Sequence, residues 1–183
     1  MKNQKLIATT LFVALMGVFV SCTDDDSDNC VPDYTGALSE AETAFVGEWR
    51  LSAIEADEEV DLTDDDEDNP STDIFAQQTA CQNDQVYEYN SDRTFTYSAG
   101  QNEEDCEGAG SIAGTWKLGG DTLGLVYNCF EDILALDFDA QRTSYTIDSN
   151  VRIEDVDGKV IQTQITLTYT KAGAEEPAPE EEN

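Results

Sequence analysis

Hydrophobic and polar residues alternate along most of the chain between residues 46 and 170, with the two-residue period of strands that bury one face. Two segments share the pattern Gly-x-Trp-(Arg/Lys)-Leu, namely 46–51 and 113–118. In each, Trp and Leu stand two positions apart and point to one face, while the charged residue between them points to water. We expect the first segment to open an antiparallel barrel and the second to form a central strand of it.

Turn residues divide this pattern into eight expected strands. Asp157-Gly158, before the last strand, is a typical hairpin signal. The strands are expected at residues 46–54, 85–89, 94–97, 113–118, 122–127, 133–138, 143–148 and 159–170, with 151–153 leading into the Asp157-Gly158 turn. Eight strands in simple succession predict an all-β, up-and-down antiparallel barrel, which removes its edges by closing.

The residues in phase on these strands form the expected barrel interior. They are Trp49, Leu51, Tyr87, Tyr89, Phe95, Tyr97, Trp116, Leu118, Leu123, Leu125, Leu134, Leu136, Phe138, Tyr145, Ile147, Ile165, Leu167 and Tyr169. The aromatic candidates for lining a ligand pocket are Trp49, Tyr87, Tyr89, Phe95, Tyr97, Trp116, Tyr145 and Tyr169. The alternative is that these rings fill the barrel themselves, as in many small barrels.

A short helix is expected before the first strand. Ser39 and Glu42 have the spacing of a capping box, which predicts a helix over residues 40–45. Such a helix could lie across one mouth of the barrel.

The segment 57–73 is strongly acidic and predicts a long loop without packing residues. Asp61, Asp64, Asp66 and Asp68 are candidate ligands for Ca²⁺, since hard cations prefer carboxylate oxygens. The spacing lacks the Gly and Glu of an EF-hand loop, so the choice is between weak Ca²⁺ binding and a solvated run of charge.

The N-terminus predicts export and lipidation. Residues 1–21 have a basic start and a fifteen-residue apolar run, too short to span a bilayer, and read as a signal peptide. The sequence 19–22, Phe-Val-Ser-Cys, resembles the lipobox of bacterial lipoproteins, with Phe19 where Leu is usual. The resemblance implies that Cys22 is lipidated and that several acyl chains anchor the chain to a membrane.

Residues 23–28, which are rich in Asp, resemble the export signal of surface lipoproteins of the Bacteroidota. That implies attachment to the outer membrane with display on the cell surface; the alternative is its periplasmic face. Residues 22–36 predict an acidic tether, residues 37–171 the barrel domain and residues 172–183 a disordered acidic tail.

Between residues 44 and 171 the chain resembles the lipocalin-like domain of Bacteroidota lipoproteins. The resemblance rests on the Gly-x-Trp opening strand, Cys81 before Tyr87-Glu88-Tyr89, a second Cys in the next loop, and residues 114–118 followed by 120–123. Arg93 stands where that family usually has Gly in a turn. The family implies a small barrel and no known reaction.

Four cysteines remain besides Cys22, and an exported protein favours two disulfides among them. Of three possible pairings we expect Cys81 with Cys106, which flank one hairpin, and Cys30 with Cys129, which would pin the tether. Zinc binding is the alternative, but no Cys-x-x-Cys spacing supports it.

Charge and composition narrow the function classes. The formal charge is -31, which repels nucleic acid, and the chain contains no His, which removes Ser-His and Cys-His chemistry. Among 40 acidic residues some pair always resembles a glycosidase pair, so composition gives no evidence for catalysis. We expect no enzymatic activity, no cofactor and a monomer. The function expected is binding of a small hydrophobic ligand, or alternatively protein contacts through the loops.

Overall fold

The computed structural model describes residues 30–63, 65, 67–104 and 106–174. The predicted signal peptide, the predicted lipidation site Cys22 and residues 175–183 of the predicted acidic tail lie outside these residues. The strands are β1 (Gly47–Val60), β2 (Ser71–Asp73), β3 (Gln85–Tyr89), β4 (Thr94–Ala99), β5 (Gly110–Gly119), β6 (Thr122–Tyr127), β7 (Phe130–Ala135), β8 (Asp137–Phe138), β9 (Ser144–Glu154) and β10 (Val160–Lys171). Three short helices accompany them, α1 (Glu40–Phe45), α2 (Ile74–Gln77) and α3 (Ala80–Asn83).

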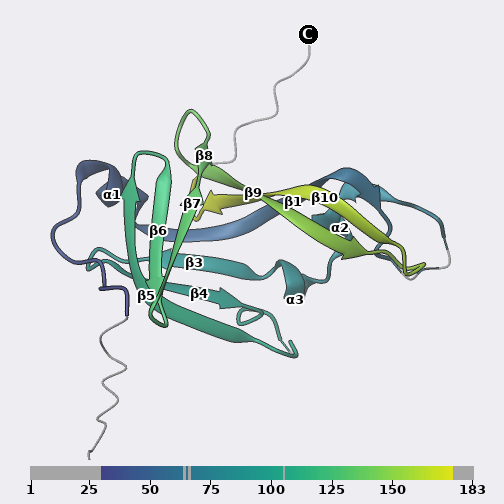
Figure 1. Cartoon of the computed structure of the whole chain (residues 1–183), viewed down its shortest axis with the longest axis horizontal. Coiled ribbons are helices and arrows are strands. Elements are labelled where there is room, and N and C mark those ends of the chain that lie inside the picture. The colour runs from purple at the N-terminus through teal and green to yellow at the C-terminus, as the bar shows by residue number, and fades with distance from the viewer. Residues whose placement is uncertain (1–29, 64, 66, 105, 175–183) are drawn as a thin grey trace, which may run out of the picture.

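The strands form one antiparallel sheet that curls into a nearly closed barrel (Figure 1). The sheet order is β7-β6-β5-β4-β3-β1-β10-β9-β8, with β2 pairing β1 from the side. β1 pairs β3 along one edge and β10 along the other, so the first and last expected strands meet. The remaining break lies between β7 and β9, which are not paired in the described sheet.

The count of ten strands differs from the expected eight. The expected strand 133–138 is divided at Leu136: β7 pairs β6 before it, and β8 pairs β9 after it. A single stretch of chain therefore crosses from one side of the break to the other. The three-residue β2 is the second addition.

The acidic segment 57–73 does pack, contrary to the sequence prediction. β1 runs on to Val60, with Ile54, Ala56 and Val60 buried and the three consecutive acids at 57–59 exposed. The helix α2 brings Ile74 onto this extension. Glu58 is in phase with Ala56 and Val60 yet exposed, so the three consecutive acids interrupt the period-two pattern and no alternation marked this part of the strand. Together β1, β9 and β10 extend beyond the barrel as a long ribbon (Figure 1).

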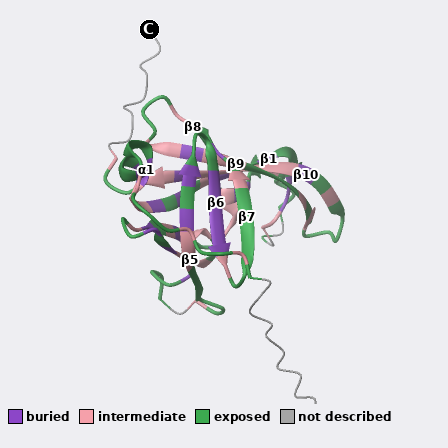
Figure 2. Cartoon of the chain, turned by 60° about the vertical axis from the view of Figure 1, so that its left-hand side comes forward, coloured by how far each residue is buried: buried purple, intermediate pink, exposed green. Residues whose placement is uncertain are grey.

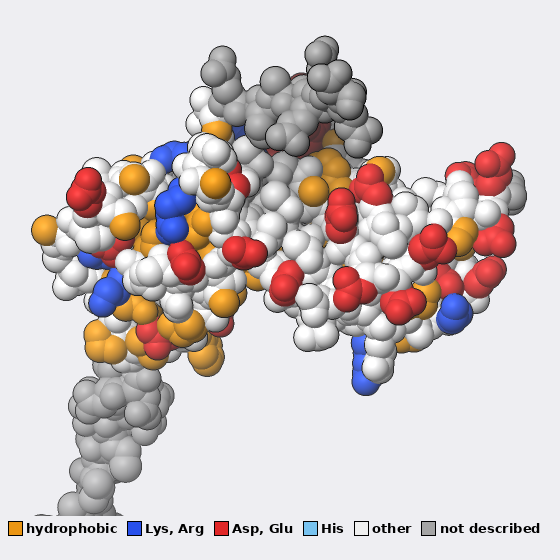
Figure 3. All heavy atoms as spheres, turned by 90° about the horizontal axis from the view of Figure 1, so that it is seen from above, with side chains coloured by type: hydrophobic (Ala, Val, Ile, Leu, Met, Phe, Trp, Pro, Cys, Tyr) orange, Lys and Arg blue, Asp and Glu red, His pale blue; other side chains and the backbone are white. Residues whose placement is uncertain are grey.

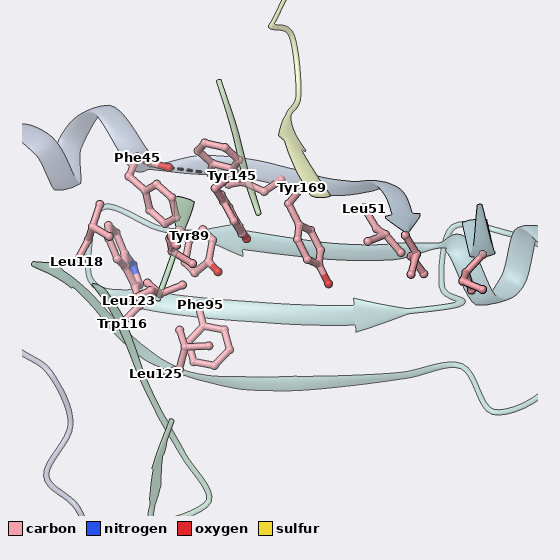
Figure 4. Packing of buried hydrophobic residues seen from close by; sticks show 14 of the residues in the cluster. Phe45, Leu51, Tyr89, Phe95, Trp116, Leu118, Leu123, Leu125, Tyr145 and Tyr169 are labelled. Atoms are coloured by element: carbon pink, nitrogen blue, oxygen red, sulfur yellow. Dashed lines mark hydrogen bonds between the residues drawn. The ribbon is translucent and has the colours of Figure 1, made fainter. Parts of the chain in front are cut away.

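One end of the barrel is filled by aromatic rings around Phe45, the last residue of α1. Its ring centroid lies 4.8 Å from Trp49, 4.7 Å from Tyr89 and 5.6 Å from Trp116 (Figure 4). The capping box predicted at Ser39 and Glu42 is formed. The predicted helix thus closes this end of the barrel.

The predicted interior residues all lie in the core or pack against it. Trp49 and Trp116 are both 0% exposed, and Trp49 Nε1 donates a hydrogen bond of 2.9 Å to the carbonyl of Phe45. The two Gly-x-Trp segments therefore supply the centre of the core.

The outer face of the barrel is partly covered by residues 30–34. Tyr34 lies over Gly124 of β6, where an added Cβ would lie 2.4 Å from the Tyr34 hydroxyl. The backbone N–H of Tyr34 donates to Thr115 Oγ1 at 2.9 Å. Figure 2 accordingly shows β6 buried along most of its length, whereas the neighbouring β7 is exposed. Of the helices that the structure describes, none is long and apolar enough to cross a bilayer.

Candidate functional site

The two ends of the barrel differ in how they are filled. At the end closed by α1, Trp49, Tyr89, Trp116 and Tyr145 are at most 1% exposed and pack against one another. These four predicted ligand residues therefore occupy the packed core. A ligand at this end would have to displace tightly packed rings.

At the opposite end the barrel holds a hollow of about 270 Å³. Its lining consists of Tyr87, Phe95, Tyr97, Ile112, Leu125, Tyr127, Asp132 and Leu134. Three predicted ligand residues, Tyr87, Phe95 and Tyr97, thus come together here. Tyr169 lies between the hollow and the core, with its ring centroid 5.4 Å from both Tyr87 and Tyr145.

Strand register explains why these side chains converge. Tyr97 pairs Tyr87 on one side and Ile112 on the other, and Leu125 pairs Asp132. Directly paired residues point to the same face of an antiparallel sheet, so all five share the inward face. Gly114 keeps the interior open next to them, because a Cβ there would lie 2.1 Å from the Val126 carbonyl oxygen and 2.8 Å from the Phe95 ring.

Hydrogen bonds fix the polar ends of Tyr97, Tyr127 and Tyr169. Gln85 Oε1 accepts from the Tyr97 hydroxyl at 3.0 Å and from the Tyr169 hydroxyl at 3.3 Å. The Tyr127 hydroxyl donates to Asp132 Oδ2. The Tyr87 ring is held by packing against the rings of Tyr89 and Tyr169.

The tyrosines of the hollow stay protonated and uncharged at pH values well above 7. Burial raises the pKa of Tyr87 and also that of Tyr97. The hydrogen bond to the Asp132 carboxylate raises the pKa of Tyr127. The π-faces of these rings thus keep the ordinary quadrupole of uncharged aromatic groups.

Sequence reasoning missed Ile112, Tyr127 and Asp132 as lining residues. Their spacing from predicted inward-facing residues could have revealed two of them. Tyr127 follows Leu123 and Leu125 at two-residue spacing, and Asp132 precedes Leu134 by two residues. An acidic residue at an inward position of a strand was the clearest indication of a site.

Larger hollows lie elsewhere on the surface. One of about 790 Å³ sits on the ribbon between Asp57, Arg152 and Gln162, and its lining is mainly polar with no aromatic ring. Another of about 510 Å³ follows the break between β7 and β9 and shares Leu134 with the barrel hollow. Neither combines a preorganised aromatic lining with an inward charge, so the barrel hollow is the better candidate site.

The predicted Ca²⁺ ligands do not form a cluster in the described residues. Asp64 and Asp66 lie outside them, and the Asp61 carboxylate accepts hydrogen bonds from the backbone N–H groups of Thr63 and Asn69. Within the described part of the chain, no group of three or more His, Cys, Asp or Glu side chains is placed to hold a metal ion. Asp61 acts there as an organiser of the loop after β1.

Both expected disulfides are present. Cys81 in α3 joins Cys106 in the loop before β5, and Cys30 joins Cys129 in the turn between β6 and β7. The Val31 N–H also donates to the Cys129 carbonyl. The second bridge fastens the N-terminal segment beside Tyr127 and Phe130, at the open end of the barrel.

Acidic side chains are spread widely over the surface. Figure 3 shows Asp and Glu along the visible face, and hydrophobic side chains gathered mainly toward one end. The most exposed large hydrophobic residues include Phe130 at 69% and Ile133 at 58%, both on β7.

The comparisons with known proteins give a family and no function. Residues 23–172 match a family described as a domain of unknown function, DUF5004. No curated protein matches the chain. The match runs from the acidic segment through the last strand of the barrel, so the chain belongs to the DUF5004 family.

Proposed function

We propose that this protein is a lipid-anchored lipoprotein of the outer membrane, displayed on the cell surface, whose lipocalin-like barrel binds a small, largely apolar molecule. The observation that carries the proposal is the hollow between Tyr87, Tyr97, Tyr127 and Leu134, opposite the end closed by α1. Binding sites for small molecules are usually concave, mostly apolar and preformed, with a few placed polar groups. The barrel hollow has each of these properties at a small size.

The anchor is proposed from the sequence at Cys22, and the bridge from Cys30 to Cys129 supports one orientation of the barrel. At about 3.3–3.6 Å per residue, the chain between Cys22 and Cys30 reaches no more than roughly 30 Å. Cys30 is bonded to Cys129 in the β6–β7 turn, beside the open end. Lipidation at Cys22 would therefore hold the open end of the barrel toward the membrane surface.

Native mass spectrometry of the protein purified from its source membranes tests ligand binding. We expect a small non-covalent adduct on the wild-type chain. Ile112→Trp places a larger side chain in the hollow and should remove the adduct. Ala113→Trp, exposed and directed outward on the same strand, should retain it. A wild-type chain without an adduct, or equal adducts on both variants, would contradict ligand binding at this site.

A second candidate function is protein contact through β7. Its support is the unpaired edge toward β9 together with the exposed Phe130 and Ile133. Exposed edges and apolar side chains are common features of protein-binding surfaces. If Phe130→Ser with Ile133→Ser abolished capture of a partner while the adduct remained, contact through β7 would operate independently of the hollow.

A further inference from the structure

We infer that the barrel hollow selects an organic cation, such as a quaternary or protonated amine, over neutral and anionic molecules of the same shape. The inference rests on the proposed function, because it names the chemical class of the molecule bound there. Four aromatic rings and one carboxylate line the hollow: Tyr87, Phe95, Tyr97, Tyr127 and Asp132.

The aromatic rings of the hollow favour a cation. The faces of aromatic rings attract cations through their quadrupole, and cages of several rings are a recurrent solution for binding quaternary ammonium groups. The Tyr87 ring centroid lies 4.7 Å from that of Tyr97 and 6.5 Å from that of Phe95, so neighbouring rings are in contact. Tyr127 lies 6.3 Å from Phe95, edge to face. These rings form a continuous aromatic wall.

The Asp132 carboxylate also favours a cation in the hollow. It is the sole charged side chain among the residues that line the hollow within the described chain. The Tyr127 hydroxyl donates to its Oδ2 atom, which fixes the carboxylate at the edge of the aromatic wall. A carboxylate beside aromatic faces attracts a cation and repels an anion, whereas a purely hydrophobic site would make no such distinction.

Two basic residues near the core lie away from the hollow. Arg93 is paired with Glu42, and Lys171 Nζ lies 5.7 Å from the Trp49 ring; both belong to the end closed by α1. The whole chain carries a formal charge of -31, from 40 acidic and 9 basic residues. The field around the open end therefore concentrates cations and disfavours anions.

Choline and 3,3-dimethylbutan-1-ol test the inference, because they share one shape and differ by the positive charge. Binding is followed by NMR shifts of the Ile112 and Leu134 methyl groups of the full chain. We expect choline to bind about tenfold more tightly than the neutral alcohol. Asp132→Asn should remove most of that preference by lowering the affinity for choline toward that for the alcohol.

Glu88→Gln is the matched control. It removes the same charge from an exposed position on β3, next to Tyr87 but off the lining of the hollow. It should leave the preference for choline intact.

Equal affinity for the two probes would overturn selection of cations while leaving ligand binding itself supported. If Asp132→Asn and Glu88→Gln reduced the preference for choline equally, the preference would come from the overall negative charge of the protein. That result would overturn the role of the hollow. No methyl shift with either probe also overturns the inference; if the purified protein carries no adduct as well, the proposed function fails with it.

Discussion

Arg93 illustrates how a single residue joins distant parts of this barrel. It has φ 71°, a left-handed backbone conformation that favours Gly, in the turn between β3 and β4. Its guanidinium donates to both carboxylate oxygens of Glu42 at 2.8 and 3.0 Å, and to the carbonyls of Gly36, Ala37 and Trp116. The buried pair thus fastens α1 to the barrel and offsets the cost of the backbone conformation.

Arg93→Ala should therefore destabilise the fold strongly. It leaves the Glu42 carboxylate buried without its partner, which typically costs about 3–5 kcal/mol. Arg93→Gly should lose about 1 kcal/mol less, because Gly adopts the left-handed conformation without strain. Urea unfolding measures both.

Arg50→Ala is the control for this prediction. Arg50 pairs with Glu48 at 2.7 Å on the exposed surface, and removing such a pair should change the free energy of unfolding by less than about 1 kcal/mol. A loss in Arg93→Ala no larger than that in Arg50→Ala would contradict the role of the buried pair.

The same pair predicts a pH dependence of stability. The hydrogen bond from Arg93, helped by the N–H groups of Ser39 and Leu118, lowers the pKa of Glu42 to about 2 from its usual 4.5, against the effect of burial. Because the folded pKa lies below the unfolded one, the stabilisation is complete above pH 4.5 and is lost as the pH falls toward 2. Its size is roughly 3 kcal/mol.

Glu42→Gln isolates this contribution from the other acidic residues. The difference in free energy of unfolding between the wild type and Glu42→Gln should be largest near neutral pH and shrink below pH 4.5. A difference that stays constant down to pH 2 would show that Glu42 does not titrate in this way.

At the scale of elements, the docking of residues 30–34 on β5 and β6 depends on the absence of a side chain at Gly124. Gly124→Ala would place a Cβ against the Tyr34 ring and displace it. We expect faster amide exchange in residues 31–35, with the barrel retained because Cys30 and Cys129 remain bonded. Gly119→Ala is the control, since a Cβ there meets nothing within 4 Å. Equal exchange in the two variants would show that Tyr34 does not hold the segment.

Elements defined by residues close together in the sequence could be predicted, whereas those defined by residues far apart could not. The hairpin of β3 and β4 and helix α1 followed from local alternation and a local capping box. The extension of β1 over residues 55–60 was missed because only Ala56 and Val60 are buried there and the other four residues are acidic. The pair of Glu42 and Arg93, 51 residues apart, left no local signal. Neither did the division of a strand at Leu136, which depends on closure of the whole sheet.

At the scale of the whole molecule, the barrel is closed by rings and α1 at one end and hollow at the other. The disulfide from Cys30 to Cys129 fastens the N-terminal segment at the hollow end, so the proposed anchor at Cys22 would lie nearer to that end. From Ile112 to Leu118, six residues along β5, the strand spans about 20 Å. An anchor near the hollow end would therefore lie closer to Ile112 than to Leu118.

The lipidated chain in bilayers should therefore show an orientation. With paramagnetic headgroup lipids, the Ile112 methyl signal should broaden more than the Leu118 signal. The Cys22→Ser chain, which lacks the anchor, should show no such difference. Stronger broadening of Leu118 would mean that the closed end faces the membrane.

A small molecule in the hollow end would leave the closed end packed. Nuclear Overhauser contacts between the co-purified molecule and methyl groups of the chain measure where it lies. We expect contacts to Ile112 and Leu134 and none to Leu118 or Leu123, which lie in the core beside Trp116. Contacts to Leu118 and Leu123, or contacts confined to outward-facing residues such as Ala113, would contradict binding at the hollow end.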